Sequence, residues 1–455
     1  MCIFNTMKPR TLLLLAALWL LAACSKKDTN PAPAPAPTPT PVVSTPFTRA
    51  DNEDLVLYEV NTPAFSASRN INGVTARLDA IKSLGVNTLW TMPIQPVGQV
   101  NSIGSPYCVR DYYGVNPSLG NLNDLKNLVN GAHARGMAVI LDWVANHTSW
   151  DHPWLAANPQ WYTQVNGQVV SPQGTGWNDV ADLNYANTDM RQAMISAMKY
   201  WVQQAGVDGF RCDAADYVPA DFWQQAIDSL RRVQPRLIML AEGARADHFS
   251  AGFDLNFSWN YLGALYGVFH NGQNASNLFT ASAAEWSTVP AGKRKLRFIT
   301  NHDEMGNSTP ATSYGGPTGA LAAEAATLFL PGNPLLYGGQ EVGVPSNSVY
   351  TGGTIDWNAN PATLQAYTKL MAAYSSSDAA RRGTLQTYPD NNVLVYTRGY
   401  NTQQLLVLVN TRNSVQTVSL DAALAGSWNN ALESGTLTVG SSMTLQPYQY
   451  VVLKK

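Results

Sequence analysis

The chain has 455 residues, a formal net charge of −2 and only 13% charged residues. This balance offers no basic field to a polyanion, which argues against nucleic acid as a partner. With 45% hydrophobic residues the chain can bury a large core, and its length suits one large barrel with an accessory domain.

The N-terminus has the pattern of a secretory signal over 1–23. Lys8 and Arg10 precede an apolar run that is too short to cross a bilayer and that ends in small residues. Residues 21–24 resemble a bacterial lipobox, and this resemblance implies that Cys24 becomes the lipidated first residue of the mature protein. A plain signal peptide is the alternative. We expect a secreted lipoprotein bound to the outer membrane, on its periplasmic or its cell-surface face.

A segment rich in proline, alanine and threonine follows the lipobox. Its composition favours the extended polyproline II conformation, which behaves as a semi-rigid spacer. We therefore expect residues 24–50 to form a lipid-anchored linker that holds a folded body away from the membrane.

From residue 55, short apolar runs alternate with helical patterns, which is typical of βα units and a parallel sheet. Eight such strands predict a closed (β/α)₈ barrel over 51–380. The predicted strands are 55–59, 88–92, 138–142, 207–211, 237–241, 253–257, 296–300 and 334–337. The predicted helices include 74–84, 122–135, 190–204 and 318–329.

Two stretches depart from this rhythm. Residues 148–180 are rich in Trp, Asn, Pro and Gly and predict an insertion after the third strand. Alternating runs near the C-terminus predict a small antiparallel β domain over 381–455. Its strands are expected at 393–397, 405–410, 415–420 and 448–453.

Polar side chains stand at or just after the ends of four predicted strands. The carboxyl ends of barrel strands share one face, so these side chains should converge there. Four acids and two histidines are among them. The residues are Asp142, Asn146 and His147 after the third strand, Arg211 and Asp213 after the fourth, Glu242 after the fifth, and His302 and Asp303 after the seventh.

Strand alternation indicates how the fourth strand is oriented. Residues two apart share a face, so Arg211 and Asp213 should point into the barrel mouth, and Phe210 and Cys212 toward the helices. The neighbouring guanidinium favours an ionised Asp213, as a nucleophile requires. Glu242 follows an apolar run, which favours the protonated form of a proton donor. Such a pair cleaves glycosides with retention when the carboxylates lie roughly 5 Å apart.

Taken together, these segments resemble the four hallmark regions of the α-amylase family of glycoside hydrolases (glycoside hydrolase family 13). The matching regions are 142–147, 209–216, Glu242 and 301–303, with further likeness at 105–113, 182–184 and 331–341. The resemblance runs from about residue 55 to the C-terminus. The order and spacing of several segments make it specific.

The resemblance implies a role for each site residue. Asp213 would be the nucleophile, Glu242 the acid/base, and Asp303 the third carboxylate, which binds hydroxyls of the sugar at the cleavage point. The residues implied to bind that same sugar are Tyr107, which stacks on its ring, and His147, Arg211 and His302. The chemistry implied by the family needs no cofactor.

A structural calcium ion is one interpretation of Asn146 and Asp182, which match calcium-ligand positions of the family. Calcium prefers a cage of several oxygen ligands. Many amylases have Lys-His where this chain has Asp216-Tyr217, and that histidine often helps to hold calcium. The alternatives are a hydrogen bond from Asn146 that orients His147, and a loop cap by Asp182.

The implied function is a retaining hydrolase that cleaves α-glucosidic, mainly α-1,4, bonds of starch-like glucans or maltooligosaccharides through a covalent glycosyl-enzyme. A transglycosylase, or an enzyme similar to α-glucosidase or neopullulanase on the same scaffold, is the second interpretation. A non-catalytic glucan-binding lipoprotein is the third. We expect a monomer whose C-terminal domain packs on the barrel; separate starch binding by that domain is the alternative.

Smaller features lead to three further expectations. Cys108 and Cys212 follow no metal-ligand spacing, and two buried thiols are favoured over a disulfide between them. Tyr58, near the end of the first strand, is a candidate for lining the pocket. Packing is favoured over a role as sugar platform for Trp150, Trp154, Trp161, Trp177 and Trp259.

Overall fold

The computed structural model describes residues 47–345 and 353–455. The predicted signal segment, Cys24 and almost all of the predicted linker lie outside these ranges. Within them, no helix is both long and apolar enough to cross a membrane.

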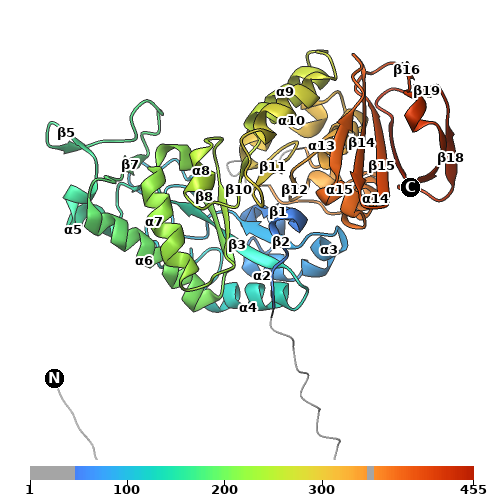
Figure 1. The fold of residues 1–455 in the computed structure, drawn as a ribbon. Helices are drawn as coiled ribbons and strands as arrows, with labels where there is room; N and C mark the ends of the chain where they lie inside the picture. The colour runs from blue at the N-terminus through green and yellow to red at the C-terminus, as the bar shows by residue number, and fades with distance from the viewer. Residues whose placement is uncertain (1–46, 346–352) are drawn as a thin grey trace, which may run out of the picture. The chain divides into compact units, whose positions relative to one another are not determined.

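Eight parallel strands close into a barrel in which each strand pairs with the next along the chain and the last pairs with the first, as predicted (Figure 1). The strands are β1 (Leu57–Val60), β2 (Thr88–Thr91), β3 (Ala138–Val144), β8 (Gly209–Asp213), β9 (Ile238–Ala241), β10 (Leu255–Phe257), β11 (Arg294–Arg297) and β12 (Asn333–Tyr337). All eight predicted positions therefore hold a strand, although the bounds shift by up to three residues.

Strand β11 shows why one of these bounds moved. It begins at Arg294 rather than at Leu296, so it starts with charged residues that a sequence pattern assigns to a loop. Arg294 is buried because its Nε donates to Asn333 Oδ1 at 2.9 Å. Arg297 is buried because its Nη1 pairs with Glu285 Oε2 at 2.6 Å. Buried charges are tolerated where such partners exist.

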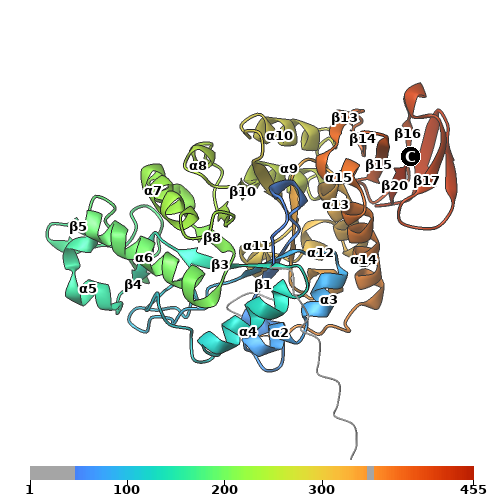
Figure 2. The ribbon, with the colours of Figure 1, turned by 60° about the horizontal axis from the view of Figure 1, so that its bottom comes forward.

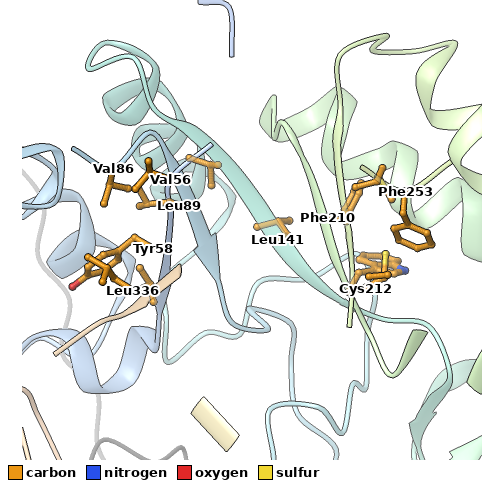
Figure 3. Close-up of a cluster of buried hydrophobic side chains, with 14 of the residues drawn as sticks. Val56, Tyr58, Val86, Leu89, Leu141, Phe210, Cys212, Phe253 and Leu336 are labelled. Carbon is orange, nitrogen blue, oxygen red and sulfur yellow. The ribbon is translucent and has the colours of Figure 1, made fainter. Parts of the chain in front are cut away.

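Side chains of the barrel strands alternate between two separate cores. The inner core fills the barrel with residues that include Leu57, Trp90, Ile140, Leu240 and Phe257. The outer core lies between the strands and the helices, and Figure 3 shows part of it, with Leu89, Leu141, Phe210, Phe253 and Cys212 labelled. The predicted outward direction of Phe210 and Cys212 is thereby confirmed.

Tyr58 belongs to the outer core as well, so the expectation that it lines the pocket is wrong (Figure 3). Its side chain is fully buried, and its hydroxyl donates to Glu341 Oε1 at 2.6 Å. Because successive residues of a strand face opposite sides, Glu59 takes the inward position instead.

Helices connect the strands and cover the outer core. They include α4 (Leu122–His133), α6 (Thr188–Ala205), α7 (Ala220–Arg231), α9 (Trp259–Phe269), α10 (Asn277–Trp286), α13 (Pro317–Leu328) and α14 (Pro361–Ser375). The predicted helix 74–84 is divided into α2 (Ile71–Thr75) and α3 (Leu78–Ser83). Helix α6 lies beside α7 (Figures 1 and 2) and ends at Gly206, whose φ of 69° suits a glycine stop.

The predicted insertion after the third strand forms a compact subdomain. Strand β4 (His147–Ser149) pairs antiparallel with β7 (Val180–Asp182) and closes the insertion at its base. Between them lie helix α5 (Pro153–Ala157) and the hairpin of β5 (Gln164–Val165) and β6 (Gln168–Val169). Trp150, Trp154 and Trp161 pack against the outer core, as expected.

The C-terminal region forms an antiparallel sheet with strand order β13-β14-β15-β20-β17-β18, and β16 pairs with β19. The strands are β13 (Thr384–Thr387), β14 (Val393–Tyr400), β15 (Gln403–Asn410), β16 (Gln416–Ser419), β17 (Gly426–Asn430), β18 (Thr436–Val439), β19 (Ser442–Leu445) and β20 (Tyr450–Lys454). This sheet contacts the barrel helices. Arg398 Nη1 donates to Phe329 O at 2.6 Å, and Arg412 Nη1 donates to Val268 O at 2.8 Å.

Cys108 and Cys212 are both buried and free, as expected. The Cys108 thiol donates to Asp179 O at 3.3 Å, in the insertion. Cys212 lies in the outer core, so its sulfur is out of reach of the barrel mouth.

Candidate active site

One cavity of about 330 Å³ opens at the carboxyl ends of the barrel strands. Six of the seven residues predicted for catalysis or sugar binding line it: Tyr107, His147, Asp213, Glu242, His302 and Asp303. Arg211, the seventh, is fully buried and contacts the cavity-lining carboxylates. The structure therefore brings all seven side chains to one place.

Arg211 is the electrostatic centre of this site. Its Nη1 donates to Asp142 Oδ1 at 2.8 Å and to Asp213 Oδ1 at 3.1 Å, and its Nη2 lies 2.9 Å from Glu242 Oε2. Asp142 also accepts hydrogen bonds from Trp90 Nε1 and the Tyr107 hydroxyl, each at 3.0 Å. One planar guanidinium thus holds Asp213 and Glu242 close together, which is the arrangement that a pair of catalytic carboxylates needs.

Ala214, which directly follows strand β8, has a strained backbone and contacts Glu242, which directly follows strand β9. Ala214 has φ 46° and ψ 39°, a left-handed conformation that is costly for any residue with a Cβ atom. This conformation aims the Ala214 amide at Glu242 Oε2, to which it donates at 2.7 Å. Ala215 N donates to Glu242 O at 2.9 Å. The strained backbone of Ala214 therefore orients the side chain of Glu242.

The direction of the Asp213 pKa shift differs from the sequence-based expectation. Burial and the neighbouring Glu242 carboxylate raise the pKa of Asp213 well above its usual value, and Arg211 only partly offsets them. Two adjacent carboxylates in a buried site tend to share one proton. A pair that holds one proton and one negative charge provides both an acid and a nucleophile.

His302 is linked to a buried acid that the sequence analysis missed. Its Nδ1 lies 2.5 Å from Glu59 Oε1, and its Nε2 lies 2.8 Å from the Tyr107 hydroxyl. Burial opposes the charged imidazole, but the Glu59 and Asp303 carboxylates outweigh burial and raise the pKa of His302 to about 9. At neutral pH, His302 is therefore a fixed cation and hydrogen-bond donor. Only the inward alternation of the first strand could have indicated Glu59.

Asp303 stands apart from the other two acids. It lies in the first turn of α11 (His302–Asn307), and 55% of its side chain is exposed. Its Oδ1 is 3.3 Å from His302 Nε2. An exposed carboxylate beside a cation is available to accept hydrogen bonds from hydroxyl groups of a ligand.

Aromatic side chains form the outer wall of the cavity. Trp177 lies with its ring centre 5.6 Å from that of His147 and 5.4 Å from that of Tyr217, and Trp259 lines another part. Trp177 thus differs from the packing role favoured for it by the sequence, whereas Trp259 packs against the inner core as favoured and also lines the cavity. Burial lowers the pKa of His147 to about 4, so its imidazole is neutral at pH 7. Flat apolar faces with a few polar groups suit an uncharged sugar.

Asn146 and Asp182, the residues matched to calcium ligands, have other partners or surroundings in the structure. Asn146 places its amide nitrogen 3.3 Å from His147 Nδ1, as in the alternative interpretation of this residue. Asp182 lies on β7, and burial raises the pKa of its carboxyl. Calcium takes six to eight oxygen ligands. In the described ranges, no three His, Cys, Asp or Glu side chains gather as metal ligands.

Comparison with known proteins gives a consistent result. A family model for the catalytic domain of α-amylase matches residues 44–171 and 175–393, and a model for the C-terminal domain of maltogenic amylase matches 385–452. An α-amylase of Haloarcula japonica is 28% identical over an alignment of 418 residues, which covers 85% of this chain and 60% of that one. A cyclomaltodextrin glucanotransferase of Bacillus licheniformis is 28% identical over an alignment of 407 residues, which covers 78% of this chain and 54% of that one.

The fold agrees with these sequence matches. The crystal structure of an α-amylase from Lactobacillus plantarum has a TM-score of 0.80 and 29% identity, over 89% of this chain and 99% of that one. The chain spans 60% or less of the length of the two curated relatives. Because the catalytic-domain model matches well over half of the residues, the chain belongs to the α-amylase family of glycoside hydrolases.

Proposed function

We propose that the protein is a retaining glycosidase that cleaves α-1,4-glucosidic bonds of starch-like glucans or maltooligosaccharides. The observation that carries this proposal is the shared cavity of Asp213, Glu242 and Asp303, with the first two acids on one guanidinium. Family membership and the α-amylases among the relatives support the substrate class.

The site supports a double displacement. In the first step, an Asp213 oxygen attacks the anomeric carbon while the glycosidic bond breaks, and Glu242 gives its proton to the departing oxygen. In the second step, Glu242 takes a proton from water, the water oxygen attacks the same carbon, and Asp213 is released as a carboxylate. Two inversions leave the product with the α configuration.

The surrounding residues suit the oxocarbenium-like transition state. Asp303 accepts hydroxyl hydrogen bonds of the sugar at the cleavage point, and the charged His302 orients Tyr107 and Asp303 toward that same sugar. Tyr107 stacks on its ring, and the neutral His147 offers one donor and one acceptor. Calcium has no step in this scheme.

Proton NMR during digestion of maltotetraose tests the stereochemistry. We expect the α-anomer of the new reducing end to appear first and the β-anomer only at the rate of mutarotation. The reaction is followed in the first minutes, with the spontaneous mutarotation of maltose as the reference. Initial release of the β-anomer would contradict the covalent mechanism.

A transferase activity on the same scaffold is the second candidate. The glycosyl-enzyme can react with a sugar hydroxyl instead of water, and one relative is named as a glucanotransferase. The exposed Tyr217 and the half-buried Trp177 at the rim offer a surface on which an acceptor sugar could stack. Products longer than the maltotetraose supplied would favour transfer over simple hydrolysis.

We further propose that Cys24 anchors the protein to the outer membrane through lipid. The first described residues join the barrel at the end opposite the cavity, where Arg49 Nε donates to Arg236 O at 2.7 Å, just before β9. We expect Cys24→Ser to move the protein from the membrane fraction to the soluble fraction and to abolish palmitate labelling, whereas Cys2→Ser changes neither. Unchanged labelling of Cys24→Ser would contradict the anchor.

A further inference from the structure

The loop after Glu242 is held from one side by the carboxylate of Asp216, which has no assigned role in the chemistry above. Asp216 Oδ2 accepts from Ala244 N at 3.2 Å, and Asp216 Oδ1 accepts from Arg245 N at 3.4 Å. In return, Arg245 Nη1 donates to Asp216 O at 2.7 Å. The loops that follow β8 and β9 are therefore joined at three points next to Glu242.

The backbone of Gly243 is shaped to admit this carboxylate. A Cβ atom on Gly243 would lie 2.4 Å from Asp216 Oδ1 and 2.6 Å from its Cγ, which no real contact allows. The φ of Gly243 is 150°, a value that L side chains rarely adopt. The residue directly after Glu242 thus leaves room for Asp216 to reach the two amides behind it.

Strand β10 holds the same loop from the other side. Phe257 N donates to Gly243 O at 3.0 Å, and Asn256 Nδ2 donates to Arg245 O at 3.1 Å. The loop is therefore fixed between β10 and Asp216. His248 Nε2 lies 3.2 Å from Asp216 Oδ1 and places a fully buried imidazole against the carboxylate. Removing the Asp216 side would leave the loop attached on one side only.

We propose that Asp216 is a positioning residue for Glu242: by binding the amides of Ala244 and Arg245, it holds the acid/base side chain in line with the departing oxygen. This inference rests on the proposed function, because it assigns Glu242 the proton transfer. Many members of the family have Lys-His where this chain has Asp216-Tyr217. An acidic side chain that binds the backbone of the loop after Glu242 therefore takes the place of a basic side chain.

A comparison of two leaving groups distinguishes a positioning role of Asp216 from a general structural defect. The sugar oxygen that departs from maltotetraose is a poor leaving group and needs a proton from Glu242 to leave as a hydroxyl group, whereas fluoride leaves α-maltosyl fluoride without that proton. The kcat/KM on the fluoride reports only formation of the glycosyl-enzyme. We expect Asp216→Asn to lower kcat/KM about tenfold or more on maltotetraose, through kcat, and less than about twofold on the fluoride.

Three further variants make the outcome decisive. Glu242→Gln should show the same dependence on leaving group with a larger amplitude, and Gly243→Ala should reproduce Asp216→Asn by displacing the carboxylate. Asp221→Asn, an exposed acid paired with Arg191 at 2.8 Å, should match the wild type on both substrates.

Equal losses on both substrates for Asp216→Asn and Gly243→Ala would overturn the positioning role. So would a loss in Asp216→Asn confined to KM, because Asp216 also lines the cavity and would then be a sugar-binding residue. If Glu242→Gln itself showed no dependence on leaving group, the proposed acid would be wrong and the proposed mechanism would fail. If Glu242→Gln depended on the leaving group as expected and Asp216→Asn did not, the positioning role alone would be rejected.

Discussion

Asp213→Asn should abolish hydrolysis and at the same time stabilise the fold. Without a nucleophile the covalent step is lost, and we expect kcat on soluble starch to fall by at least about 10³-fold. The same carboxylate is unfavourable in the folded protein, because burial and Glu242 raise its pKa well above the usual value. An amide of the same shape removes that cost, and a gain of about 0.5–2 kcal/mol in unfolding free energy is expected.

The pH dependence of this gain follows from proton linkage. Between the usual value of 3.8 and its raised folded value, Asp213 binds a proton more readily when folded than when unfolded. The stability of the wild type therefore falls as pH rises through that interval, and below it the contribution vanishes. The difference in melting temperature between Asp213→Asn and the wild type should accordingly be larger at pH 8 than at pH 5.

Melting followed by circular dichroism, with reducing-sugar release in parallel, measures both effects. Asp221→Asn is the matched control, because this acid is exposed and should change neither activity nor the pH dependence of melting. A wild-type rate in Asp213→Asn would end the nucleophile assignment. A lower melting temperature at both pH values would show that the Asp213 carboxylate stabilises the fold.

Arg211→Met should have the largest effect on stability. The side chain is fully buried and contacts Asp142, Asp213 and Glu242, so its loss leaves several buried carboxylates without their counter-ion. Breaking such a buried network costs about 3–5 kcal/mol. We expect the loss to be smaller at pH 5 than at pH 8, since protonation of the carboxylates relieves their repulsion.

Urea denaturation at the two pH values gives the unfolding free energies. Arg191→Met is the control, because Arg191 pairs with the exposed Asp221, and surface ion pairs contribute about 0–1 kcal/mol. A loss in Arg211→Met that matches Arg191→Met would mean that the carboxylates do not depend on Arg211. A loss that grows on acidification would contradict the electrostatic explanation.

The site could be located from the sequence because the patterns that mark it extend over only a few neighbouring residues. Asp213 and Glu242 follow apolar runs that form adjacent barrel strands, and strand alternation over two residues is enough to turn Phe210 and Cys212 outward. The direction of the Asp213 shift could not be predicted in this way. Arg211 lies only two positions from Asp213 in the sequence. The larger effects on the pKa of Asp213 are its complete burial and the carboxylate of Glu242, which follows the next strand.

Residues whose partners are distant in sequence escaped notice for the same reason. Glu59 meets His302 across 243 positions, and Asp216 meets Ala244 across 28. In the sequence alone, Glu59 and Asp216 each look like an ordinary acid near the end of a strand. Only the folded chain brings a histidine or two backbone amides to the acid.

The sequence by itself determined the barrel, the antiparallel C-terminal domain and the polar side chains that converge at the cavity, since hydrophobic periodicity and strand-end position are encoded over a few residues. Tertiary structure decided the direction of the Asp213 pKa shift, the raised pKa of His302 and the hydrogen bonds of Asp216 to the loop after Glu242. Desolvation and charge pairing depend on distances of a few ångströms between segments that are far apart in the chain, and closure of the barrel sets those distances.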